Sequence, residues 1–463
     1  MKNKLKNFNL FLSEFKLKNI KFENLDFNLF LIGVFLLASA PSIAAIFLLI
    51  SLLAIKFKKR NLQVESKYAK LFYLSALIFI SSAIITSISF NLNYDSLYFK
   101  SELKDWNYLL NFIGLFNWIP FFIFFSGFEY FLKSSENRKK VSLSLLLGSF
   151  PVIVTVFGQQ YFNWHGPLIF ANGLIQWFQR PVTNGGATGL FNNENYAGAW
   201  LITIFPISIA FLKNINNKMT GKNFFFFTTF FIFLTIILTK SRNSLLGILI
   251  LLPLMFSKII LYWYLPLIIV IFVLITSLIF PIYPLWISNI IRNNFPELFI
   301  SKFNYIDINN LTNLPRISLW FTSLKLIAER PFFGWGAATF PLLYAQRNNS
   351  DILYGHSHNI FLEISNNYGL IAALSVLIPI VIILKNSFKM IYLENKKNNC
   401  KFNIFERGWW TATICLLINQ QFDIQYYDIR LSIIFWLLLA GLASSLNEKN
   451  KLNQKKCKIV NLS

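Results

Sequence analysis

Charged residues, cysteines and histidines are all scarce in this sequence. Asp, Glu, Lys and Arg together make up 14% of the 463 residues, and there are only 3 Cys and 3 His. The cysteines (Cys400, Cys415 and Cys457) show no paired spacing, which argues against a disulfide framework and against a thiolate metal site. No small-residue cleavage site follows the first apolar run, so we expect no removable signal peptide.

Long apolar runs are abundant instead. Hydrophobic residues account for 55% of the chain, and the mean hydropathy is +0.52. Runs of about 20 apolar residues, the length that crosses a bilayer, recur from end to end. We therefore predict an all-α polytopic membrane protein with about 12 transmembrane helices, although about 10 or 11 would also fit the pattern. The predicted spans are 27–39, 41–55, 68–90, 108–132, 141–158, 195–212, 223–239, 243–257, 259–280, 360–384, 408–422 and 430–446.

The positive charge follows the topology of these spans. The net charge is +23, yet most of the 43 Lys and Arg lie in alternate gaps between the spans, such as 56–67 and 133–140. Loops rich in Lys and Arg stay on the cytoplasmic side of a membrane. This distribution places both termini in the cytoplasm and argues against a nucleic-acid partner. It also favours a hairpin over 27–55, broken at Ala40-Pro41, because the basic segments on either side of it should share one face.

The spans and loops divide the chain into five regions. A basic cytoplasmic tail is followed by a first membrane block with its own periplasmic loop, then by a long periplasmic loop that is partly helical, the last three spans and a cytoplasmic tail. In order, these regions are 1–28, 29–280 (with the loop 159–194), 281–359, 360–446 and 447–463.

A helix is expected within the long outer loop, over "LPRISLWFTSLKLIAERP". Pro315 suits its opening turn, and an apolar stripe recurs at helical spacing. The stripe favours a helix that lies in the outer membrane interface or packs against the bundle. Arg316 would occupy the first turn, where a cation is unfavourable unless an anion also binds there. The stripe consists of Ile317, Trp320, Phe321, Leu324 and Ile327.

Two histidines, His356 and His358, lie beside an apolar run in "GHSHNIFLEISNNYGL", on the predicted outer side. A zinc site needs three or four protein ligands, and the remaining histidine is the distant His165, so we expect no metal. A neutral imidazole can instead accept a proton from a sugar hydroxyl as a general base. The alternative is that these histidines only form hydrogen bonds at the membrane interface.

Arginines on the same side form a second set of candidates. Arg242 lies in the tight turn "LTKSRNSLLG" between two apolar runs, where a guanidinium is costly unless it is used or reaches the lipid headgroups. Guanidinium binds diphosphate well because it is always charged and donates in pairs. Arg242 and Arg316, with Arg180 as a further candidate, would form an outer-leaflet site for an anionic lipid diphosphate.

Several motifs resemble, in order, those of the O-antigen ligase/polymerase superfamily. "HNIFLEISNNYGLIA" is similar to the family signature, with His358 and Asn359 followed after nine residues by Gly369, although Ala372 departs from its last position. "GLFNNENYAGAW" resembles a family turn through Asn193 and Asn195. "TKSRNSLLG" and "RISLWFTSLKLIAERPFFGWGAATF" resemble the segments that carry the family arginines.

The resemblance implies a metal-independent, inverting glycosyltransferase that uses no cofactor and acts on the periplasmic side of a bacterial inner membrane, in lipopolysaccharide or other polysaccharide biosynthesis. His358 would be the general base, and Arg242 and Arg316 would hold the undecaprenyl diphosphate leaving group. His356, Asn359, Arg180, Asn193 and Asn195 would be secondary site residues.

The implied partners are a polyprenyl-diphosphate-linked glycan donor, the lipid bilayer and a glycan, lipid or protein acceptor. The alternative function is transport, because "FDIQYYDIRLSIIFWLLLAGL" resembles cyanobacterial members described as bicarbonate transporters. A transporter should place ionisable or broken-helix features near the middle of the bilayer, whereas the candidates here lie at its outer face.

Overall fold

The computed structural model describes most of the chain. The described residues are 25–57, 66–91, 103–182, 185–214, 219–256, 266, 269–270, 315–349, 354–394 and 404–460. Most of the predicted span 259–280, and residues 281–314 and 350–353 of the predicted loop 281–359, lie outside these residues.

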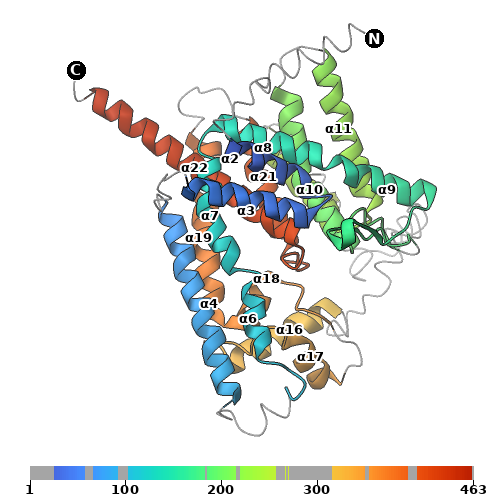
Figure 1. The fold of residues 1–463 in the computed structure, drawn as a ribbon, viewed down its shortest axis with the longest axis vertical. Helices are drawn as coiled ribbons and strands as arrows, with labels where there is room; N and C mark the ends of the chain where they lie inside the picture. The colour runs from blue at the N-terminus through green and yellow to red at the C-terminus, as the bar shows by residue number, and fades with distance from the viewer. Residues whose placement is uncertain are drawn as a thin grey trace.

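The structure is mostly helical (Figure 1). Its first half contains α2 (Leu25–Leu36), α3 (Pro41–Phe57), α4 (Lys67–Asn91), α6 (Leu109–Leu115), α7 (Ile119–Phe131), α8 (Ser135–Gly148), α9 (Phe150–Phe162), α10 (Glu194–Asn214), α11 (Met219–Leu238) and α12 (Arg242–Met255). Its second half contains α16 (Pro315–Glu329), α17 (Phe340–Asn348), α18 (Ile360–Tyr368), α19 (Leu370–Phe388) with the π-helix η4 (Lys389–Glu394), α21 (Ile404–Asn419) and α22 (Ile429–Val460).

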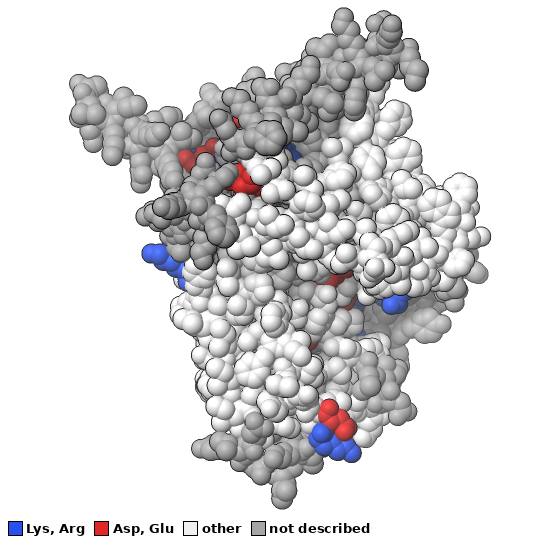
Figure 2. All heavy atoms as spheres, in the orientation of Figure 1, with Lys and Arg blue, Asp and Glu red and all other residues white. Residues whose placement is uncertain are grey.

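Apolar helices long enough to cross a membrane confirm the expected class. In the described part of the chain, 7 helices have the length and composition of a span, and 3 shorter apolar helices accompany them. Figure 2 shows that most of the described surface on one face carries no charged side chain. The fold is therefore consistent with an all-α membrane protein, while the count of about 12 spans and the orientation stay predictions.

The core is built from aromatic side chains that the sequence supplies in quantity. Phe72 of α4 packs edge-on against Trp436 of α22, with ring centroids 4.9 Å apart, and against Phe125 of α7 at 4.8 Å. All three side chains are buried. Such pairs contribute about 0.5–1.5 kcal/mol beyond the apolar area that they bury. Rings of this kind hold helices from both halves of the chain together.

The expected hairpin over 27–55 is present. Helices α2 and α3 pack against each other on either side of a short turn that ends at Ala40, directly before Pro41 (Figure 1). A side chain at Gly33 would overlap Leu48, so glycine permits this close packing. The charge pattern therefore predicted this turn correctly.

The loop predicted over 159–194 contains the one departure from an all-helical fold that the described residues show. Strands β1 (Leu168–Phe170) and β2 (Ile175–Trp177) pair antiparallel, joined by the short 3-10 helix η2 (Ala171–Gly173). Leu168 lies opposite Trp177 in this register. With three residues per strand, this hairpin is too short to form a hydrophobic core of its own.

The predicted span 360–384 is two helices rather than one. Gly369, with φ of +88°, separates α18 from α19, and a Cβ at this position would overlap the Phe332 carbonyl oxygen. The backbone after α16 fills the break, since the Trp335 N–H donates to Asn366 O at 2.7 Å and the Leu370 N–H donates to Pro331 O at 2.7 Å. The glycine of the signature therefore packs one motif segment against another.

Helix α16 forms where the sequence predicts it, from Pro315 to Glu329, but its buried face differs from the expected stripe. Its buried side chains are Leu319, Thr322, Ser323, Leu326 and Ile327, whereas Phe321 and Leu324 are 53% and 56% exposed. The helix thus packs against the protein along one face and presents apolar side chains on another.

Candidate functional site

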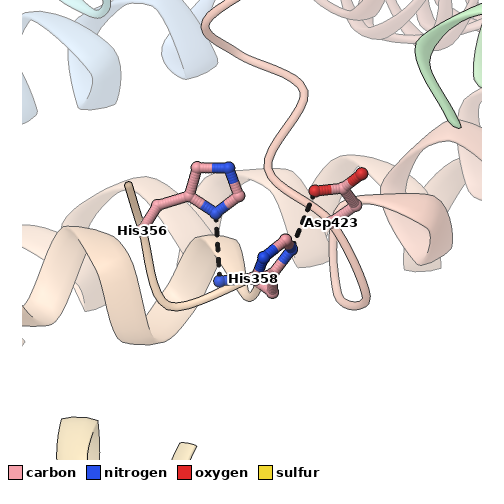
Figure 3. A group of neighbouring side chains, drawn as sticks. All are labelled: His356, His358 and Asp423. Atoms are coloured by element: carbon pink, nitrogen blue, oxygen red, sulfur yellow. Dashed lines mark hydrogen bonds and ion pairs between the residues drawn. The ribbon is translucent and has the colours of Figure 1, made fainter. Parts of the chain in front are cut away.

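The centre of the candidate site is a histidine–aspartate pair. Nδ1 of His358 lies 2.9 Å from Oδ1 of Asp423, which belongs to the loop 420–428 between α21 and α22 (Figure 3). The carboxylate side chain is 2% exposed and the imidazole 26% exposed. His358 also has φ of +55°, a strained conformation for a residue other than glycine, and such strain concentrates at functional positions.

Asn359 fixes the backbone directly after His358. It is the N-cap of α18, where its side-chain oxygen accepts hydrogen bonds from the N–H groups of Phe361 (3.0 Å) and Leu362 (3.1 Å). Its amide group donates to Gln421 O at 3.2 Å, so it also ties this helix to the loop that carries Asp423. Asn359 therefore positions His358 through the backbone.

The second oxygen of Asp423 binds a side chain from another motif. Asn195 Nδ2 donates to Asp423 Oδ2 at 3.0 Å, and Ser241 Oγ donates to Asn195 Oδ1 at 3.0 Å. Asn193 Oδ1 accepts from the Asn195 N–H at 2.6 Å, at the start of α10. The turns around 193–195 and 239–242 therefore meet the histidine segment at Asp423.

The charge environment keeps Asp423 ionised. Burial raises the pKa of its carboxyl, but the hydrogen bond and charge of His358, the charge of His356 and the Asn195 bond together lower it below its usual value. A carboxylate so held can accept Nδ1–H of the imidazole, which leaves Nε2 as the free acceptor.

Arg316 lies near both Asp423 and Arg242. Burial lowers the pKa of Arg316, the positive charge of Arg242 lowers it further, and the negative charge of Asp423 opposes both effects. Neither arginine forms an ion pair or a hydrogen bond with another residue that the structure describes. Two nearby guanidinium groups that form no ion pair with any described residue are suited to bind an anion.

Arg180 is not brought into this cluster by any contact between described residues. Its side chain is exposed, and its backbone is held by Thr188, whose Oγ1 accepts the Arg180 N–H at 3.1 Å, and by Gln159, which donates to its carbonyl oxygen at 2.9 Å. It lies between β2 and α10, so its role as a diphosphate ligand stays a prediction.

His356 contacts His358 directly. Its Nδ1 accepts the His358 N–H at 3.3 Å, and the two ring centroids lie 4.3 Å apart (Figure 3). Burial first, and then the charge of His358, lower the pKa of His356 to about 4. His356 is therefore neutral near pH 7.

A metal ion would find three ligands here, but the charges nearby oppose it. One ligand atom each from His356, His358 and Asp423 lies within 4.8 Å of the others. Three such groups are the minimum protein ligand set of a catalytic zinc site. However, Arg316 lies close enough to interact with Asp423, and Arg242 with Arg316, and two positive charges disfavour a divalent cation.

A cavity of about 550 Å³ opens beside Asn359. It lies among α16, α18, α19, α21 and α22, and its wall is apolar apart from a few groups that include Asn359 and Gln421. Trp320 and Leu324 of α16 line it, so one helix carries Arg316 at its start and apolar cavity wall in its following turns. Further lining residues are Leu377, Ile380, Leu417 and Trp436.

Sequence reasoning missed Asp423 although it singled out the segment around it. "FDIQYYDIR" places two acids in an apolar stretch at the end of a predicted span, which is a signal for function. One of them, Asp428, is instead paired with Arg430. Only the fold shows that Asp428 has a structural role and that Asp423 is the acid that binds His358.

Comparison with known families bears on this region. Residues 227–377 match the family model described as O-antigen ligase, and the match contains Arg242, Arg316 and His358. No curated protein matches the chain. The family match confirms the resemblance drawn from the motifs, and it gives no support to the transport alternative.

Proposed function

We propose that this chain, which carries an O-antigen ligase domain over residues 227–377, is a metal-independent inverting glycosyltransferase. It would move a glycan from a polyprenyl-diphosphate carrier to an acceptor hydroxyl on the periplasmic face of the bacterial inner membrane. The observation that carries the proposal is the pairing of His358 with a buried carboxylate at 2.9 Å.

His358 acts as the general base. Asp423 accepts Nδ1–H, holds the ring in one tautomer and stabilises the imidazolium that forms. Nε2 takes the proton from the acceptor hydroxyl as its oxygen attacks the anomeric carbon of the donor. The new C–O bond forms on the face opposite the diphosphate, so the anomeric configuration inverts.

The arginines act on the leaving group. As the anomeric C–O bond breaks, negative charge builds on the terminal phosphate of the polyprenyl diphosphate. Arg242 and Arg316, which are always charged and donate hydrogen bonds in pairs, neutralise that charge. Diphosphate is already a good leaving group, so this stabilisation suffices without a metal ion.

The apolar cavity supports a lipid-linked donor. A diphosphate bound at Arg316 would leave its attached chain next to Trp320 and Leu324, which line the cavity on the same helix. A cavity of about 550 Å³ is in the range of small-molecule sites, so it accommodates only the part of a polyprenyl chain nearest the diphosphate. The remainder would lie in the bilayer.

The test is a defined transfer reaction. Purified protein in lipid nanodiscs is incubated with a polyprenyl-diphosphate-linked glycan and, separately, with a lipid-anchored glycan, a free glycan or a peptide as acceptor. We expect release of polyprenyl diphosphate together with a product of inverted anomeric configuration, read by NMR. Absence of release with every acceptor, combined with bicarbonate uptake by proteoliposomes, would contradict the proposal and favour transport.

A further inference from the structure

We propose that the stacked rings of Tyr427 and His356 form the platform on which a sugar ring of the acceptor packs next to His358. This inference rests on the proposed transfer function and adds to it the place where the acceptor binds. It assigns to the site an aromatic residue from the loop 420–428, which lies outside the matched family region.

Three rings contact one another in series at the site, with Tyr427 stacked on His356 and His356 edge-on to His358 at an interplanar angle of 67°. The Tyr427 and His356 ring centroids lie 5.8 Å apart with an interplanar angle of 26°, and the His356 and His358 centroids lie 4.3 Å apart. Tyr427 is 45% exposed, whereas its neighbour Tyr426, whose ring lies 4.4 Å away, is buried. A large, partly exposed ring thus lies against His356, which in turn contacts the candidate base.

A buried acid holds this ring in place. The Tyr427 hydroxyl donates to Glu363 Oε1 at 3.3 Å, and Glu363 is only 1% exposed. The other oxygen of Glu363 accepts the Ser357 N–H at 2.9 Å. Burying a carboxylate is costly unless its oxygens are hydrogen-bonded. Here two of the donors that satisfy it are the platform ring and the loop that carries both histidines.

The chemistry of the platform fits a pyranose. One face of such a ring presents C–H groups with partial positive charge, and these pack on the negative face of an aromatic ring. The ring hydroxyls then project from its edge, where His358 can reach one of them. A neutral His356 extends the platform without adding a charge to a site that already holds Arg242 and Arg316.

The experiment separates acceptor binding from donor chemistry. Transfer is measured against acceptor concentration for the wild type, Tyr427→Leu and Tyr427→Phe. Tyr427→Leu removes the ring, so we expect the acceptor KM to rise roughly 3- to 10-fold while the donor KM stays constant. Tyr427→Phe keeps the ring but loses its anchor, so its acceptor KM should lie between the two. Tyr161→Leu, at a tyrosine that is 64% exposed on α9, is the matched control and should leave both constants unchanged.

A second measurement stands apart from turnover. Saturation-transfer NMR with a free acceptor glycan reports sugar binding in His358→Ala protein, where no transfer is needed. We expect the NMR signal to weaken when Tyr427→Leu is introduced into the His358→Ala protein.

If no transfer occurs in any protein but this NMR signal depends on Tyr427, the function proposed above fails and the platform stands. An unchanged acceptor KM and an unchanged NMR signal in Tyr427→Leu would overturn the platform and leave Tyr427 as a membrane-interface residue. Equal losses in Tyr427→Phe and Tyr427→Leu would overturn it too, because the hydroxyl rather than the ring would then matter.

Discussion

Nδ1 of His358 and Oδ1 of Asp423 lie 2.9 Å apart, although 65 residues separate them in the chain. If this pair acts as one unit, His358→Ala should lower transfer about 10²–10⁴-fold, and Asp423→Asn should lower it strongly as well. The double variant should lose little more than His358→Ala alone, because the carboxylate acts only through the imidazole. Transfer rates and membrane abundance are measured for all three proteins. Additive losses in the double variant would assign Asp423 a separate, structural role, and the exposed Asp105→Asn is the control.

The arginine pair predicts a requirement for guanidinium rather than for charge alone. Arg242→Lys and Arg316→Lys keep the charge but lose paired donation, so transfer should fall about 10-fold or more while the protein still accumulates. Independently of turnover, inorganic pyrophosphate should raise the Tm of the wild type but not of Arg316→Gln. Arg180→Lys tests whether the third arginine also binds the diphosphate. Because Arg180 is exposed, we expect a smaller loss of transfer activity in this variant. Full activity in both Arg242→Lys and Arg316→Lys would reduce these residues to interfacial anchors.

The apolar cavity predicts that adjacent positions on α19 respond differently to the same substitution. Leu377 lines the cavity, whereas the next residue, Ile378, is 53% exposed and lies outside it. Leu377→Trp should fill the cavity and raise the donor KM several-fold, and Ile378→Trp should not. Transfer measured against donor concentration in both variants decides the point. A rise of the donor KM in Ile378→Trp alone would place the lipid chain elsewhere.

The lowered pKa of His356 predicts a dependence of stability on pH. An unfolded chain binds a proton at His356 near its ordinary pKa of about 6.5, whereas the folded protein binds it only near pH 4. Between these values the unfolded state holds more protons, so stability falls as the pH is lowered through this window. His356→Gln should remove part of the decrease in Tm between pH 7 and pH 5. Identical decreases in the wild type and in His356→Gln would show that His356 titrates normally in the folded protein.

The charges around the histidines predict the response to metal. Because Arg242 and Arg316 oppose a divalent cation, EDTA should leave transfer unchanged. An excess of Zn²⁺ should inhibit by occupying the lone pairs of His356 and His358, and His356→Ala should weaken that inhibition. Loss of transfer in EDTA that Zn²⁺ restores would mean that the cluster His356, His358 and Asp423 is a catalytic metal site.

The sequence predicted the helices and turns whose formation depends on residues close together in the chain. Apolar length located the helices, the basic loops located the turn at Ala40-Pro41, and helical spacing located α16. The motifs singled out Asn195 and His358, and the structure brings the two together at Asp423, while their roles stay predictions. These successes rest on signals carried within a few turns of helix.

What the sequence did not reveal depends on contacts between distant segments. The residues next to Asp423 do not reveal its role, because that role comes from a histidine in another segment and an asparagine on α10. The break at Gly369 was missed because apolar residues continue through it, and only the approach of Phe332 explains it. The cavity was missed because residues from five helices line it.

If transfer requires the contact between Asn195, Asp423 and His358, this contact also sets the order in which the protein becomes competent during its synthesis. A ribosome delivers the asparagine first and the histidine much later, and the acid that orients the histidine follows 65 residues after that. A nascent chain that has already inserted its family-matched region, 227–377, still lacks this acid. We therefore expect no active intermediate in the bilayer until the last helices have entered it, and a chain cut before residue 423 should insert yet remain inert.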